Sequence, residues 1–215
     1  MKPPADATPL YRLSWMALRG LLNTFHRWEV YGAENIPMSG PFILAGNHAS
    51  FYDPPVFGVG CPRALTYFAR STLFKGTVGK IIRAHNAVPV DRDSGDLAAF
   101  RTVFGILKQG GGLLVFPEGT RTSDGELQPA KPGLGMIAAR TGAPIVPARI
   151  HGSFAIFSRH MKMPDLDNRL IVCYGPPLYM EDVDPGKGDP DRFLKISQAA
   201  IDAIAKLNPP PPPAT

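Results

Sequence analysis

Phe-Ile-Leu-Ala-Gly-Asn-His-Ala-Ser-Phe-Tyr-Asp-Pro-Pro, residues 42–55, carries the features that decide the fold. Its apolar start, Phe42–Ala45, is typical of a buried strand, and the two prolines that follow Asp53 suit the first turn of a helix. A sharp turn over Asn47–Tyr52 would bring the Asp53 carboxylate back toward the His48 imidazole. The stretch therefore predicts a strand, a polar turn and a helix, in that order.

Similar apolar runs alternate with helix-like patterns along the rest of the chain. Strand-helix alternation of this kind predicts an α/β fold, here a single domain whose central, mostly parallel or mixed sheet is flanked by helices. The expected strands cover residues 42–45, 64–69, 87–90, 113–116, 145–150 and 169–174, and the expected helices cover residues 10–28, 54–60, 72–84, 95–108, 133–141 and 190–206.

The bulk composition is that of a globular protein. At 215 residues and 44% hydrophobic content, the chain is long enough for one core. The sequence has no run of about 18 apolar residues, which a membrane-spanning helix would need. Its start lacks the apolar core of a signal peptide, so we expect a cytoplasmic location. Cys61 and Cys173 lack metal-type spacing and are expected to be buried free thiols. We expect a disordered start at residues 1–9, a main domain at 29–207 and a Pro-rich tail at 208–215.

The chain is basic, and the positions of its basic residues indicate which class of partner it binds. The net charge is +5, and residues 61–90 carry five basic side chains and no acidic one. Dense Lys/Arg runs and the usual nucleic-acid-binding signatures are absent, so no nucleic-acid partner is expected. The charge therefore favours a membrane surface or an anionic substrate. The five basic residues are Arg63, Arg70, Lys75, Lys80 and Arg83.

The segment 10–28 has the pattern of an amphipathic helix. Its apolar side chains and its basic or polar ones fall on opposite sides at about 100° per residue. Such a helix suits a membrane interface, and the alternative is a helix docked on the core of the domain itself. The apolar side comprises Leu10, Leu13, Ala17, Leu21, Phe25 and Trp28, and the other side comprises Arg12, Arg19, Asn23, His26 and Arg27.

The pair His48 and Asp53 has the chemistry of a general base and its orienting acid. A neutral imidazole is suited to accepting a proton near neutral pH, because its ordinary pKa is about 6.5. A carboxylate on its other nitrogen fixes the tautomer and stabilises the imidazolium that forms. Taken alone, the spacing also fits a loop histidine followed by a helix N-cap.

The stretch Phe116–Thr122 follows a second apolar run and has the chemistry of an anion site. Gly119 allows close backbone approach to a ligand, and its N–H with that of Thr120 can donate to an anion. Arg121 has the planar fork that matches phosphate oxygens, and Glu118 can hold that arginine or accept from a substrate hydroxyl. A tight turn closed by a Glu–Arg ion pair is the alternative.

Other candidate ligands lie outside these two stretches. Arg92, after the strand-like run Ala87–Val90, is a second possible phosphate ligand or a solvated charge. Lys131 precedes an expected helix start, where the helix dipole disfavours a cation, so it indicates either a nearby ligand or a solvated lysine. Asn47 and Lys75 are further candidates, and no metal site is expected.

Four blocks, in this order and spacing, resemble the glycerolipid acyltransferases of the 1-acyl-sn-glycerol-3-phosphate (lysophosphatidic acid) type. The resemblance covers roughly residues 29–178 and makes 29–207 the acyltransferase domain. It implies that His48 is the base, that Asp53 is its partner, and that the phosphate ligands are Arg92 and residues 118–121. The blocks are Asn47-His48-x4-Asp53, Val90-Asp91-Arg92, Phe116-Pro117-Glu118-Gly119-Thr120-Arg121 and Ala143-Pro144-Ile145-Val146-Pro147.

The reaction that this resemblance implies is acyl transfer from an acyl-CoA or acyl carrier protein thioester to the free hydroxyl of a lysophospholipid. The expected acceptor is 1-acylglycerol 3-phosphate, with glycerol 3-phosphate or lyso-ornithine lipid as alternatives, and no cofactor is needed. We expect a peripheral protein on the inner face of the cell membrane. A hydrolase that uses a His/Asp pair needs a nucleophile, such as the serine of a Gly-x-Ser-x-Gly turn, and the sequence lacks that motif. A non-catalytic lipid- or phosphate-binding protein remains the other alternative.

Overall fold

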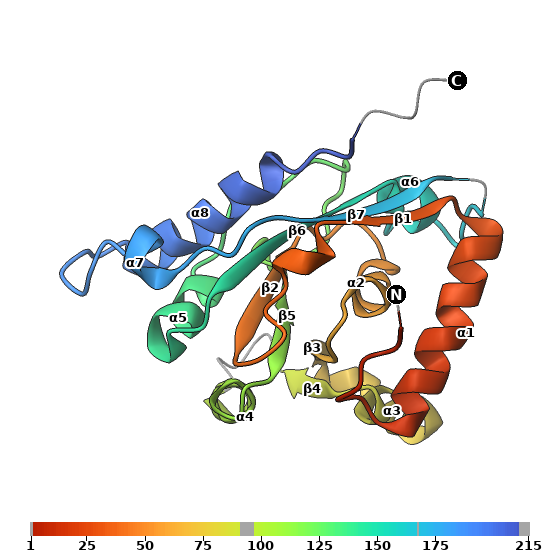
Figure 1. The fold of residues 1–215 in the computed structure, drawn as a ribbon, viewed down its shortest axis with the longest axis horizontal. Helices are drawn as coiled ribbons and strands as arrows, with labels where there is room; N and C mark the ends of the chain where they lie inside the picture. The colour runs from red at the N-terminus through yellow and green to blue at the C-terminus, as the bar shows by residue number, and fades with distance from the viewer. Residues whose placement is uncertain (1, 91–96, 167, 211–215) are drawn as a thin grey trace.

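A computed structural model describes residues 2–90, 97–166 and 168–210. These residues form a seven-stranded sheet in the order β1-β7-β6-β2-β5-β3-β4 (Figure 1). Neighbouring strands are parallel except for β6 and β7, which are antiparallel, so the expected mixed α/β sheet is confirmed. The strands are β1 Trp28–Tyr31, β2 Phe42–Gly46, β3 Leu65–Arg70, β4 Ala87–Val90, β5 Gly112–Val115, β6 Ile145–His151 and β7 Leu170–Tyr174.

Helices cover both faces of the sheet and bury one apolar cluster on each (Figure 1). On one face, α1 and α2 pack against the sheet, and on the other face α4, α5 and α8 do so. The helices are α1 Pro9–Phe25, α2 Asp53–Gly60, α3 Gly76–Ala84, α4 Leu97–Lys108, α5 Gly133–Thr141, α6 Ser153–Phe157, α7 Met180–Val183 and α8 Arg192–Ala205, with 3₁₀ turns at Ala33–Asn35 and Ser71–Leu73.

The central strands β2 and β5 are paired in parallel, and this pairing positions the site. All residues of both strands are buried, as expected for strands covered by helices on both sides, which read as continuous apolar runs. Leu44 pairs with Leu114 and Ala45 with Val115, so the carboxyl ends of the two strands lie side by side. The turns that follow them therefore meet at one edge of the sheet, where ligands bind in open α/β sheets.

Helix α1 is shorter than the sequence pattern predicts. It starts at Pro9, where Thr8 Oγ1 caps Tyr11 N–H (3.2 Å), and it ends at Phe25. Trp28, which we expected on the apolar side of this helix, instead begins β1 and pairs in parallel with Leu170 of β7. The helical pattern continued past the true end because Trp28 is apolar and lies at helical spacing from Leu21 and Phe25. The expected helix at 72–84 is likewise divided into a 3₁₀ turn and α3.

Helix α1 has two apolar stripes rather than one. It packs on the core through Tyr11, Trp15 and Leu22, which are all at most 4% exposed. The side that the sequence marked as apolar faces away from the core. Its side chains Leu10, Leu13, Leu21 and Phe25 are 48–60% exposed, and Met16 is 51% exposed beside them. These five residues are called the outer stripe of α1 below.

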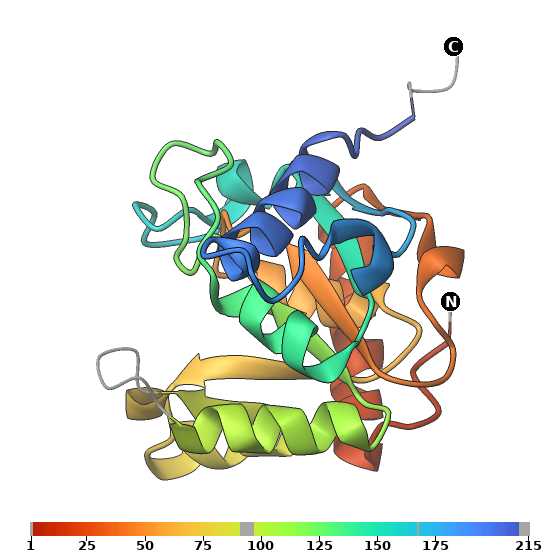
Figure 2. The same ribbon diagram turned by 90° about the vertical axis from the view of Figure 1, so that its left-hand side faces the viewer.

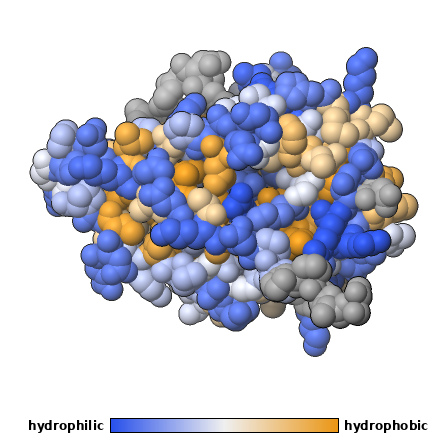
Figure 3. Space-filling view, turned by 90° about the horizontal axis from the view of Figure 1, so that it is seen from above, coloured by the Kyte–Doolittle hydropathy of each residue, from blue (hydrophilic) through white to orange (hydrophobic). Residues whose placement is uncertain are grey.

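The N-terminal residues, the cysteines and the surface were also the subject of sequence predictions. Residues 2–8, expected to be part of a disordered start, form no helix or strand, yet Pro4 is buried and the Asp6 carboxylate accepts a hydrogen bond from Ala64 N–H (3.1 Å). Cys61 and Cys173 are buried free thiols, as expected. None of the helices in the described ranges is long and apolar enough to cross a bilayer. Seen from above, hydrophilic residues surround scattered apolar ones (Figure 3).

Candidate active site

The imidazole of His48 is held by a buried carboxylate at the carboxyl end of β2. His48 Nδ1–H donates to Asp53 Oδ2 at 2.9 Å, and the same oxygen accepts the N–H groups of Ala49 (2.6 Å) and Ser50 (2.7 Å). Asp53 is fully buried at the start of α2, where Pro54 occupies the first turn. Because a carboxylate only accepts, the proton lies on Nδ1, and Nε2 keeps the lone pair that a base needs.

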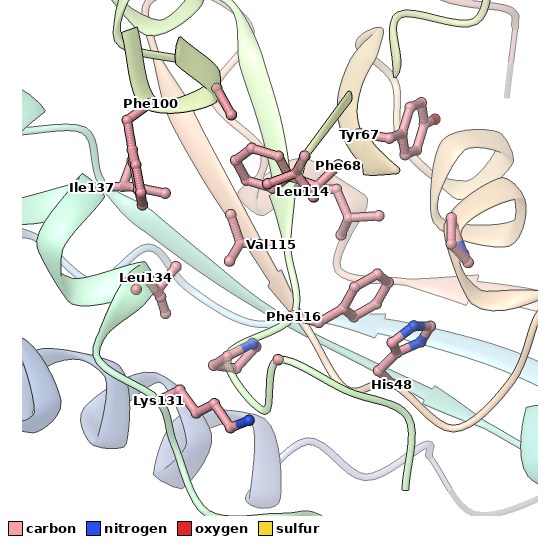
Figure 4. Close-up of a pocket in the computed structure, with 16 residues that line it drawn as sticks. His48, Tyr67, Phe68, Phe100, Leu114, Val115, Phe116, Lys131, Leu134 and Ile137 are labelled. Carbon is pink, nitrogen blue, oxygen red and sulfur yellow. The ribbon is translucent and has the colours of Figure 1, made fainter. Parts of the chain in front are cut away.

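An aromatic ring supports the other side of the imidazole. The rings of His48 and Phe116 stack with centroids 3.8 Å apart and planes inclined by 11°. Phe116 is the first residue after β5, and Figure 4 shows the two rings side by side at the edge of the cleft. Stacking and the bond to Asp53 together restrict both the tilt and the rotation of the imidazole.

Glu118 fixes the main chain on which His48 stands. Its Oε1 accepts His48 N–H (2.7 Å) and its Oε2 accepts Gln128 N–H (2.9 Å), while the side chain is only 1% exposed. Burial raises the pKa of this carboxyl, and the Asp53 charge adds to the rise, whereas the two N–H donors lower it. Both oxygens accept backbone N–H groups in this structure, and the phosphate contact of Glu118 stays a prediction.

Asn47 and Thr122 add two further connections around His48. Asn47 Oδ1 accepts Ile150 N–H (2.7 Å) and Asn47 Nδ2 donates to the Ile150 carbonyl (3.1 Å), which ties the turn to β6. Thr122 N–H donates to the His48 carbonyl at 2.8 Å. The Asn47 amide thus has a structural task in this arrangement, whereas the sequence placed it among possible ligand-binding residues.

The turn after β5 carries the expected anion-binding residues. Gly119 has a left-handed φ of +70°, which glycine adopts without strain, and its N–H donates to the Phe116 carbonyl (2.9 Å), so the turn uses that group itself. Thr120 is exposed. The Arg121 guanidinium lies over the Phe51 ring, with Cζ 3.5 Å from the ring centroid. That contact is a cation–π interaction, and it restrains the plane of the guanidinium.

The remaining candidates lie at different distances from this turn. The Lys131 side chain crosses Gly119, because a Cβ built on that glycine would stand 2.9 Å from Lys131 Cδ. Lys75 is exposed and precedes α3, on the segment that follows the carboxyl end of β3. Arg92 lies outside the described residues. Among the described residues, His, Cys, Asp and Glu side chains form no cluster of three or more that could hold a metal ion.

An apolar cleft of about 440 Å³ opens beside His48. His48, Gly119 and Lys131 form its polar end, and apolar side chains from β3, α4, β5 and α5 line the rest (Figure 4). The cleft is therefore suited to a molecule with a long apolar part and a polar group near the imidazole. Its apolar walls include Phe68, Phe100, Leu114, Val115, Leu134 and Ile137.

Several aromatic residues of the site were not predicted from the sequence. Phe116 supports His48, Phe51 supports Arg121, and Phe100 lines the cleft from α4. Phe51 lies between His48 and Asp53, and Phe116 begins the stretch that ends at Arg121. Their positions in the sequence could therefore have predicted a contact with the site. Phe100 carried no such signal, because in a helix facing the sheet an aromatic side chain is ordinarily core.

The chain matches known proteins over most of its length. The family model described as Acyltransferase matches residues 27–151. A 1-acyl-sn-glycerol-3-phosphate acyltransferase of Bacillus subtilis is 34% identical over 202 residues, covering 92% of this chain and 96% of that protein. The chloroplastic 1-acyl-sn-glycerol-3-phosphate acyltransferase BAT2 of Brassica napus is 30% identical over 133 residues, which cover 60% of this chain and 38% of the plant protein.

A solved structure has the same fold. The crystal structure of the 1-acyl-sn-glycerophosphate (LPA) acyltransferase PlsC from Thermotoga maritima aligns with a TM-score of 0.71 and 27% identity, covering 90% of this chain and 77% of that one. The family match spans both turns of the site, from His48 and Asp53 to Arg121. On this evidence of sequence and fold together, the chain belongs to the acyltransferase family.

Proposed function

We propose that this protein transfers a fatty acyl group from a thioester to the free hydroxyl of 1-acylglycerol 3-phosphate, giving phosphatidic acid. The observation that carries the proposal is the His48–Asp53 pair, 2.9 Å apart at the polar end of an apolar cleft that borders the Arg121 turn. The names of the relatives from B. subtilis and T. maritima support this acceptor. The acyl donor is a CoA or carrier-protein thioester, and no cofactor takes part in the chemistry.

His48 acts as the general base in this reaction. Its Nε2 accepts the proton of the acceptor hydroxyl while the oxygen attacks the thioester carbonyl carbon. A C–O bond forms, the C–S bond breaks, and the imidazolium returns the proton to the leaving sulfur. Asp53 stabilises the imidazolium through Nδ1–H, and Phe116 keeps the ring in place.

The two substrates occupy the two ends of the cleft. The acyl chain lies along the apolar walls formed by Phe68, Phe100 and Ile137. Arg121 binds the acceptor phosphate, with Lys131 as a second cation across Gly119. Holding the phosphate fixes the hydroxyl against the base, so these cations contribute to positioning as well as to affinity.

The acceptor is reached from a membrane surface through the outer stripe of α1. Leu13 and Leu21 are 60% and 53% exposed on that stripe, although the same helix is anchored in the core by Trp15 and Leu22. An apolar stripe of this kind is suited to the interfacial region of a bilayer. The exposed Arg70, Lys75 and Lys80 add positive charge that attracts anionic lipids. We propose that the protein acts at the inner face of the cell membrane.

Replacing the base tests the catalytic assignment. His48→Ala should lower kcat for acylation of lysophosphatidic acid by about 10²–10⁴, because the hydroxyl proton loses its acceptor. Thermal unfolding and binding to phospholipid vesicles should stay near wild type, and His85→Ala, at another histidine, should keep full activity. Activity of His48→Ala within a few-fold of wild type would refute the assignment.

Replacing the arginine tests the phosphate site. Arg121→Ala should raise the KM for lysophosphatidic acid strongly, since binding shared by the ground state and the transition state is lost. The KM of Arg121→Lys should lie between those of the wild type and Arg121→Ala. Lysine keeps the positive charge but loses the planar guanidinium and its stacking on Phe51. The exposed Arg140→Ala serves as control. An unchanged KM in Arg121→Ala would remove this residue from the phosphate site.

Polar substitutions on the outer stripe test the membrane contact without disturbing the core. The double variant Leu13→Ser/Leu21→Ser should bind phosphatidylglycerol-containing vesicles about tenfold or more weakly in a flotation assay, because two leucines no longer enter the interface. Its thermal unfolding should match wild type, since both side chains are exposed. Met38→Ser, at a site 70% exposed, is the matched control. Equal binding by wild type and the double variant would contradict the assignment.

A further inference from the structure

A second exposed apolar element stands beside the site, in the segment 158–166 between α6 and β7. Met163 is 76% exposed, the highest value among the large hydrophobic side chains of the described residues, and Leu166 is 42% exposed. No described helix or strand covers them, and the segment itself forms no helix or strand. Leaving two large apolar side chains in water in one short loop is unfavourable unless a partner covers them.

The charges in this segment identify the kind of partner. Arg159 and His160 precede Met161, Lys162 stands between Met161 and Met163, and the acidic residues of this loop, Asp165 and Asp167, both come after Pro164. Asp165 Oδ2 accepts the side-chain amide of Asn168 (2.9 Å), so that carboxylate is directed at its own chain. An anionic lipid bilayer has negatively charged head groups at its surface and apolar acyl chains beneath them. Basic side chains next to exposed apolar ones match both layers.

The segment and the residue directly before it, Phe157, are hydrogen-bonded to the two turns of the candidate site. Arg159 Nη1 donates to the Arg121 carbonyl (3.3 Å), and His160 Nε2–H donates to the Ser123 carbonyl (3.1 Å). On the other turn, the Phe157 carbonyl accepts Ser50 Oγ–H (2.8 Å) and Phe51 N–H (3.3 Å). Figure 2 shows this segment beside the long loop that follows β5. Whatever covers the segment therefore lies at the mouth of the site.

Asn168, which follows this segment in the sequence, adjoins the carboxyl end of α1. His26 Nδ1–H donates to the Asn168 carbonyl (3.1 Å), and the His26 ring packs edge-on against Tyr52, 6.0 Å between centroids. Phe25, the last residue of α1, is 48% exposed next to this junction. The outer stripe of α1 and the segment 158–166 thus lie at one end of the molecule (Figure 1).

We propose that the segment 158–166 is a second membrane-binding element. Met163 and Leu166 enter the interfacial layer of an anionic bilayer, and Arg159 and Lys162 bind its phosphate groups. The bilayer surface then meets the Phe51–Arg121 stack, so that a lipid acceptor enters the site from the membrane without crossing water. This last step rests on the proposed function, whereas contact between the segment and lipid does not.

Depth-dependent quenching tests the contact directly. In Met163→Trp, fluorescence should be quenched by phosphatidylglycerol vesicles whose acyl chains are brominated, after subtraction of the wild-type signal from Trp15 and Trp28. Lys187→Trp, an exposed position at the opposite end of the molecule in the turn between α7 and α8 (Figure 1), should not be quenched. Equal quenching in the two variants, or no quenching in Met163→Trp, would overturn the proposal.

Binding and activity measured on one further pair of variants separate this proposal from the proposed function. Lys162→Gln should weaken binding to phosphatidylglycerol vesicles about fivefold, the effect of one basic residue near an anionic surface, while Lys187→Gln should not. Acylation of a short-chain lysophosphatidic acid dissolved as monomers should be equal in both variants. Unchanged vesicle binding of Lys162→Gln refutes the membrane contact. Absence of acylation by the wild-type protein refutes the proposed function and leaves the binding result intact.

Discussion

The site depends on one buried carboxylate that joins two neighbouring turns. Glu118 stands after β5, and its two oxygens accept N–H groups from His48, after β2, and from Gln128. Burying an ionised carboxylate is costly, and the raised pKa of Glu118 reflects that cost. Two charge-assisted hydrogen bonds offset it, since such bonds are stronger than neutral ones. The backbone under the imidazole is therefore fixed by the same segment that carries Arg121.

Around this carboxylate, the reactive side chains and the backbone that carries them are held by neighbouring groups. Asp53 and Phe116 hold the His48 ring, by a hydrogen bond and by stacking. Phe51 lies under the Arg121 guanidinium, and the Arg121 carbonyl receives Arg159 from the segment 158–166. Held in this way, the base and the cation lose little freedom when substrates bind, which is how positioning lowers a barrier. The neighbouring segment also connects the site to the surface proposed to meet the membrane.

Local sequence predicted the parts of the site that depend on local geometry. The prolines at 54 and 55 and the turn before them sufficed to bring Asp53 to His48, and the buried runs sufficed for the strands of the central sheet. The partners of Glu118 could not be predicted, because its acceptor role requires knowing that β2 and β5 are neighbours. The face by which α1 packs on the core was missed for a related reason, since Trp15 and Leu22 gain their role only from the sheet they cover.

The most direct test of this account is the kinetics of Glu118→Gln, measured together with thermal unfolding. A glutamine has one acceptor oxygen and one NH2 group, which only donates, so either His48 N–H or Gln128 N–H loses its acceptor. If Glu118 positions the base, kcat for acylation of lysophosphatidic acid falls about tenfold to a hundredfold, while the KM for that acceptor stays near wild type. A raised KM with unchanged kcat in a folded variant would contradict the account, because it would make Glu118 a contact of the acceptor.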